Sequence, residues 1–249
     1  MTTRIAAILL PPLLLTGWEG YCRWSGIPAL VLPSPSAVGA ALWSGLASGR
    51  LLSHLAMTAT EMALGLGIGC LVGFVAGVAL AEVAGLRRLL YPYVIASQVV
   101  PKLALAPLFI LWFGFGMSST VAITALICFF PLLENTLTGL DRVDPAKREL
   151  FRMLRAGRWR TLTRLKIPSG LPVILAGLRV AVVLALVGAV VGEFIGGRQG
   201  LGASIIAAQG MMDTPLMFAL FAVITALGML VYQATLLIER WLLSRQAKG

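Results

Sequence analysis

Long apolar runs, separated by short polar segments, follow one another along nearly the whole chain. An apolar run of about 20 residues forms a helix long enough to cross the hydrocarbon core of a bilayer. The pattern therefore predicts six membrane spans, together with a surface helix at residues 37–48. The expected spans cover residues 5–17, 51–81, 89–113, 118–138, 173–195 and 216–243.

The first run is short and contains Pro11 and Pro12, so a cleaved signal peptide is the alternative to a membrane span. A signal peptide ends at a cleavage site with small residues. Trp18 and Glu19 follow this run instead, and tryptophan is typical of the membrane interface. We expect a retained span.

The composition agrees with a polytopic membrane protein. Hydrophobic residues make up 59% of the 249 positions and charged residues only 12%, far from the averages of soluble proteins. We expect one all-α transmembrane domain over residues 1–249. The net charge of +10 does not indicate a nucleic-acid partner, because the excess lies in loops where membrane insertion alone places basic residues. The three cysteines lack metal-site spacing, and His54 is the only histidine, so we expect no metal.

A glycine stripe marks the second expected span. Gly65, Gly69, Gly73 and Gly77 recur at every fourth residue and therefore share one helix face. Small residues on one face allow a second helix to approach closely within a membrane. We expect a helix-packing surface here.

Three prolines, Pro92, Pro101 and Pro107, interrupt the third expected span. Proline lacks the backbone donor of a helical hydrogen bond, and such breaks are tolerated in a membrane where protein or a wet cavity satisfies the freed carbonyls. We expect a bent helix that forms a wall of a translocation pathway, with Pro101, Lys102 and Pro107 along it.

Charged residues also occur inside the spans or at their ends, where an ionised group at the bilayer centre costs at least ~2.5–3.5 kcal/mol. They must pair with one another or face a wet cavity, and both alternatives remain open. Arg179 and Glu193 join Lys102 as candidates for the pathway lining. The full set is Glu61, Lys102, Glu134, Arg179 and Glu193.

Residues 140–172 hold nine of the twenty Lys and Arg residues between two apolar runs. Short loops rich in Lys and Arg stay on the cytoplasmic side. With both termini cytoplasmic, fifteen basic residues fall inside and only three outside, which supports this orientation. Apolar residues recur within the block at helical spacing, so we expect short amphipathic helices, one of them near residues 149–160. Asp144 and Pro145 predict a helix start, and Pro168 and Pro172 predict its end before the next span.

Motifs for enzyme chemistry are missing from the sequence. No lysine stands in a GxxxxGK[ST] phosphate loop, and no GxSxG elbow accompanies His54. The glycines at 196–202 lack the strand and helix that a dinucleotide site requires. We expect a transport protein that is not an enzyme and that binds no cofactor itself.

The basic block also carries a family resemblance. Glu149, position 155 and the residues Leu-Lys-Ile-Pro at 165–168 reproduce the spacing of the EAA loop of ABC importer permeases, which reads Glu-Ala-Ala, three residues, Gly, nine residues, Ile-x-Leu-Pro. Leu150 and Phe151 stand where the family has small residues, and Arg155 stands where it usually has glycine. The chain is similar to the binding-protein-dependent type I family, and within it to the nitrate, sulfonate and taurine permeases. Further matching positions are 32–35, 101–116, 135–136, 177–179, 193 and 200–202.

This resemblance implies a type I ABC importer permease fold in the bacterial inner membrane, with a coupling loop at about 139–170. It implies an ATPase dimer that binds ATP and Mg²⁺, a second permease copy and an external solute-binding protein, besides membrane lipid. The solutes of the similar permeases are small and often anionic. The residues expected to contact the ATPase are Glu149, Leu150, Phe151, Arg152, Leu154, Arg155, Trp159 and Pro168.

Two other classes remain open. A secondary transporter driven by an ion gradient would have similar spans and intramembrane charges. A structural membrane protein could place the basic loop on anionic lipid headgroups.

Overall fold

The computed structural model describes residues 2–246, with the side chains of residues 9–245, and this range is helical without any strand. The elements are α1 (Thr2–Ser25), α2 (Pro35–Ala47), α3 (Arg50–Glu82), α4 (Ala84–Val99), the 3-10 helix η1 (Lys102–Leu105), α5 (Ala106–Phe113), α6 (Met117–Asp141), α7 (Pro145–Met153), α8 (Arg158–Thr161), the π-helical η2 (Leu162–Lys166), α9 (Ile167–Gly196), α10 (Leu201–Gly210) and α11 (Thr214–Gln246).

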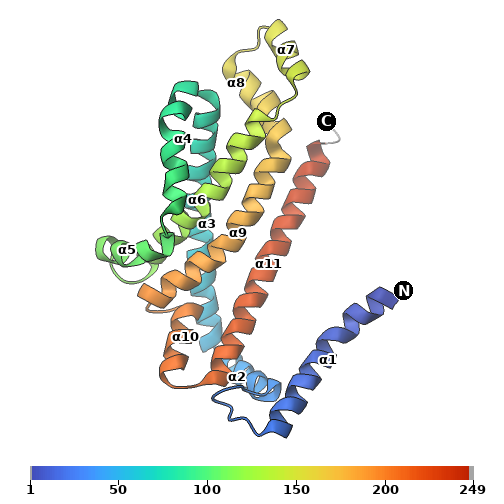
Figure 1. The fold of residues 1–249 in the computed structure, drawn as a ribbon, viewed down its shortest axis with the longest axis vertical. Coiled ribbons are helices and arrows are strands. Elements are labelled where there is room, and N and C mark those ends of the chain that lie inside the picture. The colour runs from blue at the N-terminus through green and yellow to red at the C-terminus, as the bar shows by residue number, and fades with distance from the viewer. Residues whose placement is uncertain (1, 247–249) are drawn as a thin grey trace.

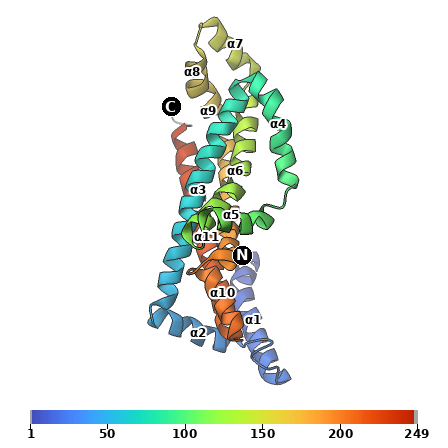
Figure 2. The ribbon, with the colours of Figure 1, turned by 90° about the vertical axis from the view of Figure 1, so that its left-hand side faces the viewer.

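Four long helices, α3, α6, α9 and α11, run along the length of the molecule (Figure 1). The helices α7 and α8 lie at one end, near the C-terminus, and α2 and α10 lie at the other (Figures 1 and 2). We call these the α7 end and the α2 end. The expected surface helix and the second, fourth, fifth and sixth spans are confirmed as α2, α3, α6, α9 and α11.

The structure tests five of the six expected spans. Within residues 9–245 four helices are long and apolar enough to cross a membrane, or five if the bent pair Ala84–Val99 and Lys102–Phe113 counts as one span. The expected first span, residues 5–17, falls in α1. It lies partly outside the described side chains, which begin at residue 9. The multi-pass membrane architecture is nevertheless clear, because the four long helices have mean hydropathies between 1.7 and 2.6.

The glycines of α3 face α6. A methyl group on Gly69 would come within 2.5 Å of the Ala125 carbonyl oxygen, and one on Gly73 would overlap the Phe129 carbonyl oxygen. Only glycine permits backbones to approach this closely, which in lipid replaces the hydrophobic drive that packs helices in water. α6 packs as extensively on α9 as on α3, so these three helices form the centre of the bundle.

The third expected span is bent, as the prolines predict. Its two halves meet at 87° between Val100 and Pro101. The residue before a proline avoids the helical region, and Val100 is extended with ψ 124°. Pro92 lies within α4, whereas Pro107 lies in the first turn of α5, where its missing donor is harmless.

Two expectations for the basic block are wrong. Pro168 and Pro172 do not end a helix but lie inside α9, because α8, η2 and α9 form one continuous apolar helix over Arg158–Gly196. Pro168 lies in the first turn of α9, directly after the π-helical turn, where a missing backbone donor is tolerated, and Pro172 lies in the interior of α9. The expected single coupling helix at 149–160 is divided into α7 and α8 by a break at residues 154–157.

Candidate functional site

The coupling segment, which we define as α7, α8 and the break between them, projects beyond the long helices at the α7 end (Figure 1). Its start is as expected. Asp144 caps α7 by accepting a hydrogen bond from the Ala146 N–H at 2.9 Å, and Pro145 occupies the first helical position.

The end of α7 is a turn that favours glycine at position 155. Arg155 adopts the left-handed conformation with φ 50°. The Ala156 N–H donates to the Phe151 carbonyl and the Arg155 N–H to the Arg152 carbonyl, which together form a Schellman motif. The residue after the cap of this motif is left-handed, and glycine adopts that conformation without strain. Arg155 therefore holds this left-handed turn at a cost of roughly 1 kcal/mol.

We predict that Arg155→Gly stabilises the end of α7 by about 1 kcal/mol, because it relieves the left-handed strain. Hydrogen exchange of the backbone amides at 154–156 should slow by about fivefold. The control is Arg148→Gly in the interior of α7, where glycine should instead speed exchange. Faster exchange in Arg155→Gly would show that the arginine side chain itself holds the turn.

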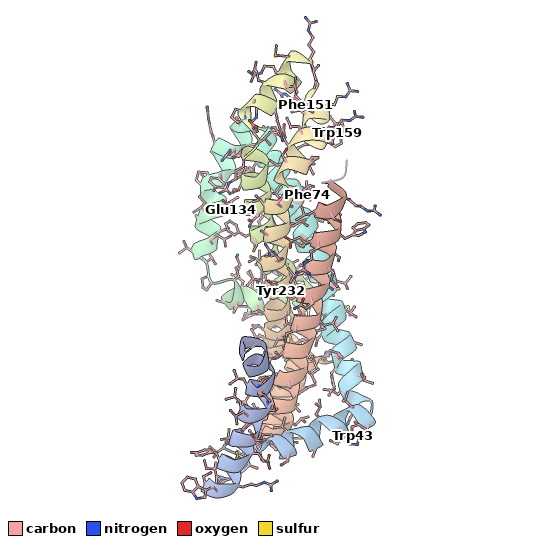
Figure 3. The ribbon with its side chains drawn as sticks, turned by 90° about the vertical axis from the view of Figure 1, so that its right-hand side faces the viewer. Trp43, Phe74, Glu134, Phe151, Trp159 and Tyr232 are labelled. Carbon is pink, nitrogen blue, oxygen red and sulfur yellow. The ribbon has the colours of Figure 1, made fainter. Side chains whose placement is uncertain are left out.

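Apolar side chains on the coupling segment are open to solvent. Leu154 is 68% exposed and Trp159 is 76% exposed, and Leu150 and Met153 are also exposed. Figure 3 shows Phe151 and Trp159 at the α7 end, beyond the bundle. Arginines surround them, and Arg152 pairs with Glu149 at 2.9 Å. An apolar centre with a charged rim is the composition of a protein-binding surface.

The coupling segment is joined firmly to the bundle behind it. Leu162 and Leu165 of η2 are buried. Lys166 forms an ion pair with Glu82, the last residue of α3, at 2.6 Å, and both side chains are mostly buried. These contacts tie the base of α8 to α9 and α3.

Lys102 lies at the bend after Pro101. Its ammonium group donates to the Gln98 side-chain oxygen at 2.9 Å and lies 5.5 Å from the centre of the Phe130 ring. The Lys102 ammonium group at this bend is therefore held by a neutral amide oxygen and by an aromatic face.

Arg179 is paired across the bundle. Its guanidinium lies 3.3 Å from the Glu239 carboxylate of α11. The two helices border a cavity of about 470 Å³ whose lining includes Arg179 and Tyr232. Because Glu239 neutralises Arg179, this cavity offers no unpaired positive charge from that residue.

Glu193 holds the start of α10 rather than standing free. Its carboxylate accepts hydrogen bonds from the Thr58 hydroxyl at 2.6 Å and from the Gly202 N–H. The Thr58 oxygen accepts from the Leu201 N–H at 2.8 Å, and His54 Nδ1 accepts from the Gly200 N–H at 3.1 Å. Three consecutive backbone N–H groups at the start of α10, at residues 200–202, are thus bound by side chains of α3 and α9.

Glycine is required on both sides of Leu201 for this arrangement. Gly200 has φ 115°, and a methyl group there would overlap the Glu193 carboxylate. A methyl group on Gly202 would lie 2.5 Å from the Val190 carbonyl oxygen. The string Gly200-Leu201-Gly202 is therefore a structural partner of Glu193.

Several of these partners were not expected from sequence. Thr58 could have been singled out, since it lies one turn from His54 and near Glu61 on α3. Glu239 lies within the sixth span, and its pairing with Arg179 has no local sequence signal. Within residues 9–245 there is no group of three His, Cys, Asp or Glu side chains that could hold a metal ion.

A second cavity of about 330 Å³ lies at the α2 end, among α2, α3, α10 and α11. Arg50, His54, Arg198 and Asp213 contribute its charged and polar lining, and Leu51 and Leu220 part of its apolar lining. It lies directly beside the hydrogen bonds that hold the start of α10.

Comparison with known proteins gives the family. A sequence profile described as "Binding-protein-dependent transport system inner membrane component" matches residues 69–248. The chain is 39% identical to the riboflavin transport system permease protein RibX of Chloroflexus aurantiacus, over 94% of this chain and 88% of the relative. It is 36% identical to the formylaminopyrimidine transport permease protein ThiX of Halalkalibacterium halodurans, over 95% and 94%.

More distant relatives complete the comparison. The chain is 32% identical to the putative aliphatic sulfonates transport permease protein SsuC of Bacillus subtilis, over 95% of this chain and 86% of the relative. Its fold matches a chain of the MetNI methionine ABC transporter with a TM-score of 0.69 at 17% identity, covering 78% of this chain and 96% of that one. The chain therefore belongs to the family of binding-protein-dependent inner membrane permeases, the transport components of ABC importers, which are not themselves enzymes.

Proposed function

We propose that this chain couples a separate cytoplasmic ATPase dimer to alternating access in an ATP-driven importer of a small solute. The observation that carries the proposal is the exposed apolar surface of the coupling segment, on residues that follow the spacing of the EAA loop. In this proposal Leu150, Phe151, Leu154 and Trp159 are apolar anchors in an ATPase cleft. The arginines Arg152 and Arg155 and the carboxylate of Glu149 form the polar rim, and Pro168 lies in the continuous helix behind it.

Movement of the ATPase would reach the pathway through one continuous helix. Residues 158–196 run from the coupling segment to Glu193 and the start of α10 at the opposite end (Figure 1). A rigid helix transmits a displacement along its whole length, so closure of the ATPase pair would shift both ends together. ATP and Mg²⁺ would be bound by that partner.

The orientation of the chain in the membrane follows from the distribution of its basic residues. The α7 end is basic and carries the C-terminus, so we place it and both termini in the cytoplasm of a bacterial inner membrane, in contact with lipid. The α2 end would then meet the external solute-binding protein. A second copy of the chain would enclose the pathway, with Pro101, Lys102, Pro107 and Arg179 along it, whereas the buried Glu193 would stand behind it as the cap of α10. No nucleic acid takes part.

The solute has two candidates. A small anion such as a sulfonate or taurine agrees with the SsuC relative and with Lys102, whose partner is neutral. A heterocycle of the riboflavin or pyrimidine type is favoured by the higher identities to RibX and ThiX. The pairing of Arg179 with Glu239 also favours a heterocycle, because it leaves one positive charge fewer for an anionic solute.

Uptake by the purified assembly in lipid vesicles tests the function. We expect uptake that needs ATP, stops with vanadate and is indifferent to an ionophore. Uptake driven by an ion gradient without ATP would instead identify a secondary transporter. The same vesicles decide between the two solute classes when they are offered radiolabelled solutes of each. Uptake of taurine and an alkanesulfonate would identify the anion class, and uptake of riboflavin and formylaminopyrimidine the heterocycle class.

A further inference from the structure

Glu61 is a fully buried carboxyl group without a hydrogen-bond donor. Its side chain is 0% exposed, and neither carboxyl oxygen receives a hydrogen bond from any residue at 9–245. It lies one turn before Gly65 and so continues the glycine stripe that faces α6. Glu61 lies one turn after Thr58 on the same buried face of α3, and Thr58 donates to the Glu193 carboxylate at 2.6 Å, so the two carboxyl groups are neighbours. A buried acceptor without a donor is costly, so this contact needs an explanation.

The fixed donors of the neighbourhood all point at Glu193. Its two oxygens accept from the Thr58 hydroxyl and the Gly202 N–H, while the side chain is only 1% exposed. Hydrogen bonds of this kind stabilise an ionised carboxylate. Among the described side chains no Lys or Arg forms an ion pair with either glutamate. Two negative charges in contact, without a cation, are not tolerated in such a site.

We propose that Glu61 and Glu193 hold one proton between them, carried by Glu61, and that this proton is a structural ligand of the junction among α3, α9 and α10. The protonated Glu61 carboxyl then donates its hydrogen to the ionised Glu193 carboxylate. This gives Glu61 a partner and Glu193 a third donor. Both observations, the missing donor at Glu61 and the full set of donors at Glu193, are satisfied by the same proton.

The position of the pair gives the proton its role. Glu193 can bind the start of α10 only while it stays ionised, and α3 can close on α9 there only if Glu61 is neutral. The proton on Glu61 thus allows the ionised Glu193 to cap α10 inside the closely packed junction among α3, α9 and α10. This inference is independent of the importer's solute and of the ATPase contact.

Two isosteric variants of the full chain, purified in lipid nanodiscs, separate this arrangement from its reverse. Glu61→Gln should keep the melting temperature within about 2 °C, because the amide N–H replaces the carboxyl O–H as the donor to Glu193. Glu193→Gln should lower it by roughly 4–8 °C, because the charged acceptor for Thr58 and Gly202 is lost. A larger loss in Glu61→Gln than in Glu193→Gln would overturn the placement of the proton.

Infrared spectroscopy observes the proton directly. The full chain should show, at neutral pH, the C=O stretching band of a buried carboxylic acid, and Glu61→Gln should remove it. The matched control is Glu134→Gln, which changes a carboxyl group that Tyr91 contacts at 3.2 Å and should leave the band in place. A spectrum without the band, or a band that persists in Glu61→Gln, would refute the shared proton.

Discussion

Gly73→Val should prevent α3 from packing on α6 and leave little folded permease in the membrane. A methyl group at this position already overlaps the backbone carbonyl oxygen of Phe129, which cannot move without displacing α6. Overpacking of this kind costs about 3 kcal/mol, which is roughly a hundredfold in the ratio of folded to unfolded chain. The measurement is the yield of monodisperse protein by size-exclusion chromatography after extraction in mild detergent.

The matched control is Gly67→Val in the same helix. Gly67 is exposed, and nothing lies within 4 Å of the position that its methyl group would occupy. Both variants place the same β-branched residue in α3, so any loss of helix propensity is common to the two. Equal yields of the two variants would mean that the close contact between α3 and α6 is not what holds the bundle together.

The positions of the helices could be predicted from sequence because apolar periodicity and span length are local properties. The expected span at 51–81 became α3 at Arg50–Glu82, and the span at 118–138 became α6 at Met117–Asp141. The cap at Asp144 was equally local. The continuity of α8 with α9 was missed, because Pro168 reads as a helix end unless it is recognised as a first-turn residue.

The site depends on contacts that join distant parts of the chain. The partners Arg179 and Glu239, Lys166 and Glu82, and Thr58 and Glu193 are each separated by 60 or more residues. No periodicity within one helix reports such a pair. A partial signal existed for Glu61, because its spacing from Gly65 already placed it on the packed face of α3, where an acidic side chain has no access to water.

The coupling segment allows a sharp test because two tryptophans have the same exposure at opposite ends of the molecule (Figure 3). Trp159 is 76% exposed at the α7 end, and Trp43 is 75% exposed on α2. Trp159→Ala should weaken binding of the ATPase by about 2 kcal/mol or more, roughly thirtyfold in Kd, because an aromatic anchor at an interface carries a large share of its binding energy.

Trp43→Ala should leave ATPase binding unchanged, since the cytoplasmic partner is expected only at the α7 end. Copurification of the ATPase with tagged permease, followed by titration in nanodiscs, measures both variants. Neither side chain supports the core, so both variants should insert and fold normally, and a loss in Trp159→Ala reports the interface alone. Retention of the ATPase by Trp159→Ala together with its loss in Trp43→Ala would place the motor at the α2 end and reverse the orientation proposed for the whole chain.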